Sequence, residues 1–289
     1  MMQKMIPHIF LTFIAGALAD CKIKIIKNFL IRTFIALYKP NLEEVMSKDI
    51  NSYSSYNDFF TRKLANESRI IELSENSFIS PVDGEIVSHG FIEDGKLLQA
   101  KKHDYELDEL VGIDYQNKYK EGYFITIYLA PTDYHRIHCP WDGEIIHSNH
   151  LGSSLYSVNK KAQESIPRLY IKNERSVLHI VSNSLEYALV SVGASVVGSI
   201  VPFWIDNKDC SRKELVEEWK IGPPADLFST LPLILFLNNL CYQSKRAQYS
   251  LQQRHPLIPV HIQGCLRRCV TRISHFLYKD VEWILGLSY

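Results

Sequence analysis

The sequence predicts an α+β protein in which N-terminal helices precede a β-rich domain. Residues 5–19 and 22–38 are apolar stretches with roughly helical spacing. From about residue 78 to residue 204, short runs of Val, Ile, Tyr and Phe are separated by Asp-Gly and Pro, a pattern typical of strands joined by tight turns. The 289 residues are enough for one large domain or two small ones with a real core.

The composition excludes several classes of protein. Hydrophobic residues make up 46% of the chain, which excludes a disordered protein, and the formal net charge of zero argues against a general nucleic-acid binder. The six cysteines include no CxxC pair, so neither a disulfide scaffold nor a structural zinc knuckle is expected. The charge is uneven, because residues 225–289 hold three acidic and seven basic side chains.

The N-terminal segment, residues 1–70, is predicted to be a helical membrane-docking region. Residues 5–19 would form a helix of about 22 Å, too short to cross a bilayer. Residues 22–38 place Lys and Arg among Ile, Phe and Leu, as in a basic amphipathic helix at a membrane interface. Two alternatives stay open, a buried core helix and a signal peptide that ends at Ala17-Leu18-Ala19.

Residues 71–224 are predicted to be a β-rich catalytic domain. The apolar runs that predict its strands are 86–87, 97–98, 124–129, 145–146, 177–181 and 187–201. Helices are expected within 157–166 and within 211–219. In the second of these, Ser211 is the candidate cap and Glu214 would complete a capping box.

A short internal repeat occurs inside this domain. Residues 81–86 and 140–145 share the pattern P-x-D-G-E-I and lie 59 residues apart. They could mark two related hairpin corners in one β-domain, or the pattern could recur only because it makes good turns.

The densest group of titratable residues lies within 128–141, the segment YLAPTDYHRIHCPW. His135 and His138 stand beside Asp, Tyr and Arg at the end of an apolar run, and imidazole suits proton transfer near neutral pH. Acid/base catalysis, a metal site and ordinary structural histidines all stay open on the pattern alone, since H-x-x-H without further spaced ligands is a weak metal signal. Asp83 is a turn residue that could orient a histidine if the two meet.

Four segments together resemble the phosphatidylserine decarboxylase family. They are FFTRKL at 59–64, SPVDGEI at 80–86, YLAPTDYHRIHCPWDGEI at 128–145 and VGASVVGSI at 192–200, in the family's order and with similar spacing. The resemblance covers roughly residues 5–220.

The resemblance implies a pyruvoyl enzyme that converts phosphatidylserine into phosphatidylethanolamine and CO2. In this family a serine in a Gly-Ser-Thr motif attacks its own preceding peptide bond, which splits the chain into β and α subunits and leaves a pyruvoyl group on the α subunit. By motif, Asp83 and His138 would be the charge-relay partners that activate the serine. His135 would be the acid/base residue of decarboxylation, reprotonating the α-carbon. No metal and no nucleic acid are expected.

The expected partners are phosphatidylserine and an anionic membrane surface, together with the α and β subunits and a homodimer of these. The expected location is peripheral, on the cytoplasmic face of a bacterial inner membrane.

The C-terminal part departs from the family pattern. No Gly-Ser-Thr occurs anywhere in the sequence, so the pyruvoyl-forming serine is not identifiable. The segment most similar to this motif is Phe228-Ser229-Thr230, where a bulky Phe replaces the glycine. Residues 225–289 are therefore expected to be a divergent, basic, Cys/Leu-rich tail of uncertain fold, arising from an altered reading frame or from genuine divergence.

Three functional hypotheses follow from the sequence. The first is an active, self-processing decarboxylase. The second is an inactive, unprocessed homologue that only binds membrane lipid. The third is a metal-dependent secreted hydrolase, suggested by the histidines and the Ala-Leu-Ala site.

Overall fold

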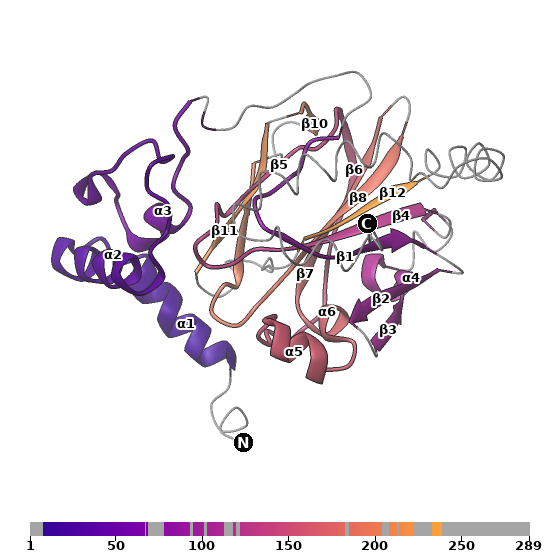
Figure 1. Cartoon of the computed structure of the whole chain (residues 1–289), viewed down its shortest axis with the longest axis horizontal. Helices are drawn as coiled ribbons and strands as arrows, with labels where there is room; N and C mark the ends of the chain where they lie inside the picture. The colour runs from indigo at the N-terminus through magenta and orange to yellow at the C-terminus, as the bar shows by residue number, and fades with distance from the viewer. Residues whose placement is uncertain are drawn as a thin grey trace, which may run out of the picture.

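The α+β class is confirmed by a computed structural model, which describes residues 8–66, 68, 78–92, 95–100, 103–112, 118–119, 122–182, 185–203, 208–212, 214–221 and 233–238. Figure 1 shows three N-terminal helices on one side of a β-rich body. The helices are α1 (His8–Ala19), α2 (Lys24–Tyr38), η2 (Ile50–Ser52, a 3-10 turn), α3 (Tyr56–Phe60), α4 (Leu107–Val111), α5 (Lys160–Ser165) and α6 (Leu169–Lys172).

The strands form one large sheet and two small ones. They are β1 (Glu85–Phe91), β2 (Lys96–Ala100), β3 (His103–Glu106), β4 (Gly122–Tyr128), β5 (Arg136–His138), β6 (Gly143–Leu151), β7 (Arg175–Val181), β8 (Glu186–Val192), β9 (Ser199–Pro202), β10 (Asp209–Cys210), β11 (Leu215–Lys220) and β12 (Leu233–Asn238). The seven-stranded sheet has the order β1-β4-β12-β8-β7-β6-β10, the three-stranded sheet has the order β5-β11-β9, and β2 pairs with β3. The described pairings between these strands are antiparallel.

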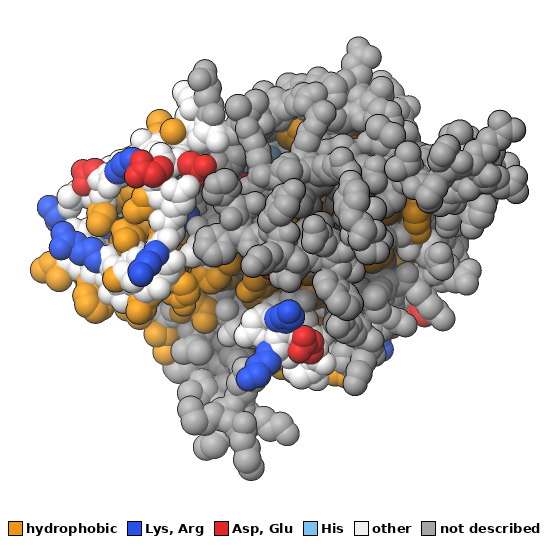
Figure 2. Space-filling model, in the orientation of Figure 1, with side chains coloured by type: hydrophobic (Ala, Val, Ile, Leu, Met, Phe, Trp, Pro, Cys, Tyr) orange, Lys and Arg blue, Asp and Glu red, His pale blue; other side chains and the backbone are white. Residues whose placement is uncertain are grey.

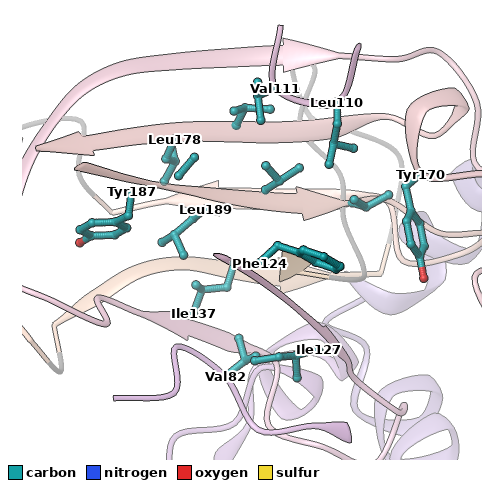
Figure 3. Close-up of a cluster of buried hydrophobic side chains, with 14 of the residues drawn as sticks. Val82, Leu110, Val111, Phe124, Ile127, Ile137, Tyr170, Leu178, Tyr187 and Leu189 are labelled. Atoms are coloured by element: carbon teal, nitrogen blue, oxygen red, sulfur yellow. The ribbon is translucent and has the colours of Figure 1, made fainter. Parts of the chain in front are cut away.

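The main hydrophobic core lies between the large sheet and the small sheet that carries β5. Strands β7 and β8 are buried along almost their whole length, and most of their residues are apolar. Ile137 of β5 belongs to the same buried cluster as Leu178 and Leu189 of the large sheet (Figure 3). The core therefore holds β5 on one face, and β5 contains His138 and directly follows His135.

The N-terminal helices build a second, smaller core. Phe34 of α2 meets the rings of Tyr56, Phe59 and Phe60 at centroid distances of 5.8, 6.0 and 6.3 Å. Ile31 of α2 is fully buried in the same cluster. Among the residues that the structure describes, no helix is both long and apolar enough to cross a membrane.

One strand of the large sheet lies beyond residue 224, in the segment predicted to be a separate tail. Strand β12, in the segment expected to be a divergent tail, pairs with β4 on one side and with β8 on the other. The rest of residues 222–289 lies outside the described part of the chain.

One predicted helix is confirmed and one is wrong. The helix expected within 157–166 is α5, capped by the Asn159 side chain, which accepts a hydrogen bond from the Ala162 amide. The helix expected within 211–219 is instead a turn followed by strand β11. The Glu214 carboxylate does accept a hydrogen bond from the Ser211 amide, 3.0 Å, so half of the capping box forms. The chain then extends because β11 pairs with both β5 and β9.

The strand predicted over 187–201 is broken into two. Strand β8 ends at Val192 and β9 begins at Ser199, in a different sheet. The intervening residues include Val196, which has a positive φ of 77°. The Val196 backbone N–H donates a hydrogen bond to the hydroxyl of Thr12 in α1.

The repeated P-x-D-G-E-I segments form two equivalent corners. Each leads into a strand that pairs with a later antiparallel strand, β1 with β4 and β6 with β7. The register shifts at the same relative position in both, between Ile86 and Ser88 and between Ile145 and His147. The repeat is therefore structural as well as sequential, and not only a recurrence of turn residues.

Each corner contains a glycine that leaves no room for a side chain. Replacing each glycine with alanine therefore tests whether the two corners are equivalent. A Cβ at Gly84, where φ is +155°, would lie 2.5 Å from the Tyr128 carbonyl oxygen, and a Cβ at Gly143 would lie 2.8 Å from the Val181 carbonyl oxygen. We expect Gly84→Ala to lower the free energy of unfolding by about 3 kcal/mol and Gly143→Ala by about half as much, measured by urea denaturation.

Gly90→Ala is the matched control within β1. A Cβ at this position would meet only the Phe124 ring, at an ordinary distance of 3.5 Å. We expect a change within about 1 kcal/mol. Equal losses for Gly84→Ala and Gly90→Ala would contradict the steric argument.

Candidate active site

Three of the four segments that carry the family resemblance, 59–64, 80–86 and 128–145, meet around strand β5. The Phe60 ring lies 4.1 Å from the His135 ring, centroid to centroid. The Arg136 Nε donates a hydrogen bond to the Thr61 carbonyl at 2.8 Å. The His138 amide donates to the Pro81 carbonyl, also at 2.8 Å, which brings the turn that holds Asp83 beside β5. Segments separated by up to about 75 residues thus form one site.

His135 is fully buried and is held in one tautomer. Its Nδ1 lies 2.8 Å from the Asp133 carbonyl oxygen, and because a carbonyl only accepts, Nδ1 carries the proton. Burial lowers the pKa of His135 to about 3, with a smaller contribution in the same direction from the positive charge of Arg62. The ring is therefore neutral at pH 7, with Nε2 as a proton acceptor.

His138 lies on the opposite side of β5 from the core. Its Nε2 is joined to the Tyr134 hydroxyl by a hydrogen bond of 2.9 Å, and the two rings stack at 5.6 Å. Asp83 precedes Gly84 in the adjacent turn and is half-buried. The structure therefore brings the turn of Asp83 close to the backbone of His138.

Asp133 shapes the loop that leads into β5. Its carboxylate accepts a hydrogen bond from the Ala130 amide at 2.7 Å, and burial raises its pKa despite that bond. This contact closes the loop that presents the Asp133 carbonyl to the Nδ1 of His135.

Arg62 is a buried cation beside these groups, and the sequence analysis did not single it out. It is only 4% exposed, and its Nη2 donates to the Thr132 carbonyl at 2.7 Å. Its Nε and Nη1 are buried without a hydrogen-bond partner. Burial lowers its pKa, while the nearby carboxylates of Asp133 and Asp83 favour its charged form. Its position within FFTRKL was the only sequence signal for it.

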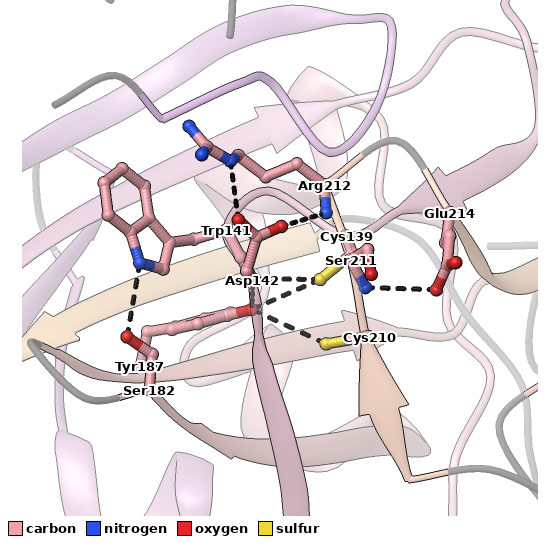
Figure 4. A network of polar contacts seen from close by, with 9 residues as sticks. All are labelled: Cys139, Trp141, Asp142, Ser182, Tyr187, Cys210, Ser211, Arg212 and Glu214. Atoms are coloured by element: carbon pink, nitrogen blue, oxygen red, sulfur yellow. Dashed lines mark hydrogen bonds and ion pairs between the residues drawn. The ribbon is translucent and has the colours of Figure 1, made fainter. Parts of the chain in front are cut away.

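A polar cluster follows β5 and holds its end in place (Figure 4). The Tyr187 hydroxyl donates to the Trp141 carbonyl at 2.5 Å and lies 3.4 Å from the Cys139 sulfur. A hydrogen bond with the Cys210 thiol, together with burial, raises the pKa of Cys139. Because Cys139 directly follows His138, this cluster fixes the backbone on the far side of the histidine.

The metal hypothesis finds no support in the described part of the chain, where no group of three or more His, Cys, Asp or Glu side chains is arranged to hold a metal ion. Of the two Gly-Ser pairs, Ser199 is buried in β9 and Ser153 follows β6. Ser229 lies outside the described residues.

Comparisons with known proteins match most of the chain. A family model described as phosphatidylserine decarboxylase matches residues 56–230, and a second one, described as PSD, matches residues 1–39. Three similar proteins are each named phosphatidylserine decarboxylase proenzyme. The protein of Methylobacillus flagellatus is 38% identical over 220 residues, 75% of this chain and 78% of that protein. The protein of Hamiltonella defensa is 36% identical over 236 residues, 81% of each chain. The protein of Legionella pneumophila is 38% identical over 219 residues, 75% of this chain and 76% of that protein.

Proposed function

The chain belongs to the phosphatidylserine decarboxylase family, and we propose on this basis that it is a carboxy-lyase that converts phosphatidylserine into phosphatidylethanolamine and CO2. The observation that carries the proposal is the meeting of three of the family's segments around His135, His138 and the turn of Asp83. The same comparisons give no support to the hypothesis of an inactive lipid-binding homologue or to that of a secreted hydrolase.

The protein's own residues have distinct tasks in this proposal. His135 offers a neutral imidazole whose Nε2 accepts a proton, so it must first take up a proton before it can reprotonate the α-carbon. The Phe60 ring covers one side of His135 and helps to keep water away from it. Asp83 and His138 are assigned the charge relay in maturation, with Tyr134 holding the His138 ring through its Nε2.

Some features of the chain match the pyruvoyl group expected for the family, and one feature does not. A pyruvoyl carbonyl would supply the electron sink that decarboxylation of an α-amino acid requires. The buried, neutral His135 fits the acid/base side of such chemistry. The precursor motif does not fit, because the sequence has no Gly-Ser-Thr and Ser229 follows Phe228.

We place the protein at the surface of an anionic membrane, as a peripheral protein of the cytoplasmic face of a bacterial inner membrane. The helices α1 and α2 expose large apolar side chains, including Phe13, Leu18, Ile25, Phe29 and Leu37. Figure 2 shows apolar and basic side chains side by side over these helices. Lys27 does not contribute to this surface, because it is buried and donates to the Tyr53 carbonyl at 2.6 Å.

The proposal is tested by incubating the purified full chain with phosphatidylserine vesicles and measuring CO2 and the intact mass under denaturing conditions. It requires CO2 release and two fragments, the smaller with a pyruvoyl group at its N-terminus. A single 33.4 kDa chain that releases no CO2 would overturn it and would leave the lipid-binding alternative. CO2 release from an uncleaved chain would overturn the assignment of a pyruvoyl group.

A further inference from the structure

Arg62 is a buried cation just after α3, and no step of the proposed reaction uses it. Its side chain is 4% exposed, and its guanidinium carbon lies 5.6 Å from the centre of the Phe59 ring. Among the described residues, only one of its three nitrogens has a hydrogen-bond partner: Nη2 donates to the Thr132 carbonyl at 2.7 Å. The side chain therefore makes one polar contact, and that contact goes to a distant part of the sequence.

Burial of this kind does not by itself stabilise the fold. Taking a charged guanidinium out of water is costly, and each buried N–H group without a hydrogen bond adds to the cost. An apolar side chain of similar length, such as methionine, would fill the same space without that cost. The arginine at this position therefore calls for a reason other than stability.

The hydrogen bond of Arg62 reaches the turn that presents His135. Thr132 stands in that turn next to Asp133, whose carbonyl accepts the hydrogen bond from Nδ1 of His135 at 2.8 Å. The Asp133 carboxylate closes the same turn by accepting from the Ala130 amide at 2.7 Å. A shift of the Thr132 carbonyl would therefore move the group that fixes the orientation and the tautomer of the imidazole.

The two residues before Arg62 hold the same stretch of chain. The Phe60 ring lies 4.1 Å from the His135 ring, centroid to centroid. The Thr61 carbonyl accepts a hydrogen bond from the Arg136 Nε at 2.8 Å. Three consecutive residues at the end of α3 thus contact the segment before His135, the histidine itself and the residue after it. Arg62 supplies the contact on the side of the turn.

We propose that Arg62 is a positioning residue for His135, which through the Thr132 carbonyl fixes the turn that orients the imidazole. The inference rests on the proposed function for the reaction that His135 serves, but the tether itself does not depend on turnover. Displacing a reacting group by about 1 Å can lower a rate by about 100-fold. A side chain that never touches the substrate can therefore control kcat. This role requires a donor at the end of the side chain, and not only apolar packing.

The test compares Arg62→Met with Lys27→Met, each of which removes a buried cation that donates to a backbone carbonyl. Lys27 is 5% exposed, and its hydrogen bonds in the described part of the chain go to the carbonyls of Tyr53 at 2.6 Å and Ile50 at 3.3 Å, and not to the loop before β5. With phosphatidylserine vesicles and the full chain, we expect Arg62→Met to lower kcat at least tenfold while KM stays within threefold. Lys27→Met should keep kcat within threefold.

The second readout is the Nδ1 proton of His135, which a merely structural role of Arg62 would leave unchanged. Because that proton is buried and bonded to the Asp133 carbonyl, it should give a slowly exchanging imidazole N–H resonance in protein labelled with 15N-histidine. Its absence in His135→Asn assigns the resonance. We expect Arg62→Met to lose it through exchange with water and Lys27→Met to keep it. Arg62→Lys restores a single donor, so it should recover the resonance and at least a third of kcat.

Full kcat or an unchanged resonance in Arg62→Met would overturn the proposal. Equal losses in Lys27→Met would also overturn it, because they would reduce Arg62 to one of several residues that hold the small core together. If Arg62→Met does not fold, Arg62→Gln replaces it, since glutamine is too short to reach the Thr132 carbonyl, and the same losses are expected. If the wild-type chain releases no CO2 but its His135 resonance depends on Arg62, the proposed decarboxylation fails and the tether stands. If CO2 is released and the Arg62 variants keep both kcat and the resonance, only the positioning role fails.

Discussion

Replacing His135 with asparagine is expected to lower the kcat of phosphatidylserine decarboxylation by about 100-fold or more, the range for loss of an acid/base group. Asparagine can place an amide N–H where the Nδ1–H of His135 now donates to the Asp133 carbonyl. It has no counterpart of Nε2. The substitution therefore preserves the hydrogen bond to the Asp133 carbonyl but removes Nε2, the ring nitrogen that carries no proton.

His135→Gln is the companion variant, because glutamine reaches the Nε2 position and loses the donor to Asp133. If His135 acts through proton transfer, both variants lose activity, because neither amide titrates near neutral pH. If His135 is only structural, the asparagine variant should stay active while the glutamine variant loses stability. Steady-state kinetics with vesicles, together with thermal unfolding of each variant, distinguishes these results, and full activity of His135→Asn would refute the catalytic role.

The β-rich domain was predictable because its strands are marked locally. The central strands β7 and β8 are buried on both faces, and their apolar runs show it in the sequence. The two P-x-D-G-E-I corners were also visible, since turn residues act within a few positions. The sequence pattern did not predict the register shift that follows both Ile86 and Ile145. That shift depends on partner strands more than 30 residues later in the chain.

Strand β11 was mistaken for a helix because its decisive contacts are non-local. Residues 211–219, SRKELVEEW, are rich in Glu, Lys, Arg and Leu, which favour a helix on propensity. Glu217 is instead buried and accepts hydrogen bonds from Ser176 at 3.2 Å and Ser191 at 3.1 Å, on strands of the large sheet. Nothing close to Glu217 in sequence indicates those serines, so the tertiary contacts overrode the local preference.

The titratable residues proposed for the site stand out in the sequence, whereas the residues around them do not. Asp83, His135 and His138 stand out as residue types suited to proton transfer. Arg62 and Asn57 do not, because they look like ordinary residues of a polar segment. Their importance comes from the packing of α3 on the loop before β5 and on the end of β11.

The second large effect expected is a loss of stability in mild acid. The pKa of His135 and that of His179 are both lowered to about 3 by burial, whereas an unfolded histidine titrates at 6.5. Between these values the unfolded chain binds more protons than the folded one, so stability falls as pH decreases from 6.5 toward 3. Each histidine contributes a slope of about 1.4 kcal/mol per pH unit well below pH 6.5. His89 and His150, whose pKa values are also lowered by burial, act in the same direction.

The measurement is urea unfolding at intervals between pH 6.5 and 5, above the range where most carboxylates titrate. Asp133 has a raised pKa and therefore acts in the opposite sense, stabilising the fold at low pH and losing that contribution as pH rises through its folded pKa. The acid slope thus belongs mainly to the buried histidines in this window. A stability that does not change over the window would contradict the buried, neutral state assigned to His135.

His179 offers a variant that isolates one of these protons without touching the candidate site. It lies on β7, and the Tyr119 hydroxyl is 3.2 Å from its Nδ1. His179→Phe should reduce the acid slope by about 1.4 kcal/mol per pH unit, because one titrating group is lost. Tyr119→Phe is the matched control: it removes the hydroxyl and lowers stability, but it leaves the imidazole and hence the slope. A flattened slope in the control, or an unchanged slope in His179→Phe, would show that the acid sensitivity arises elsewhere in the chain.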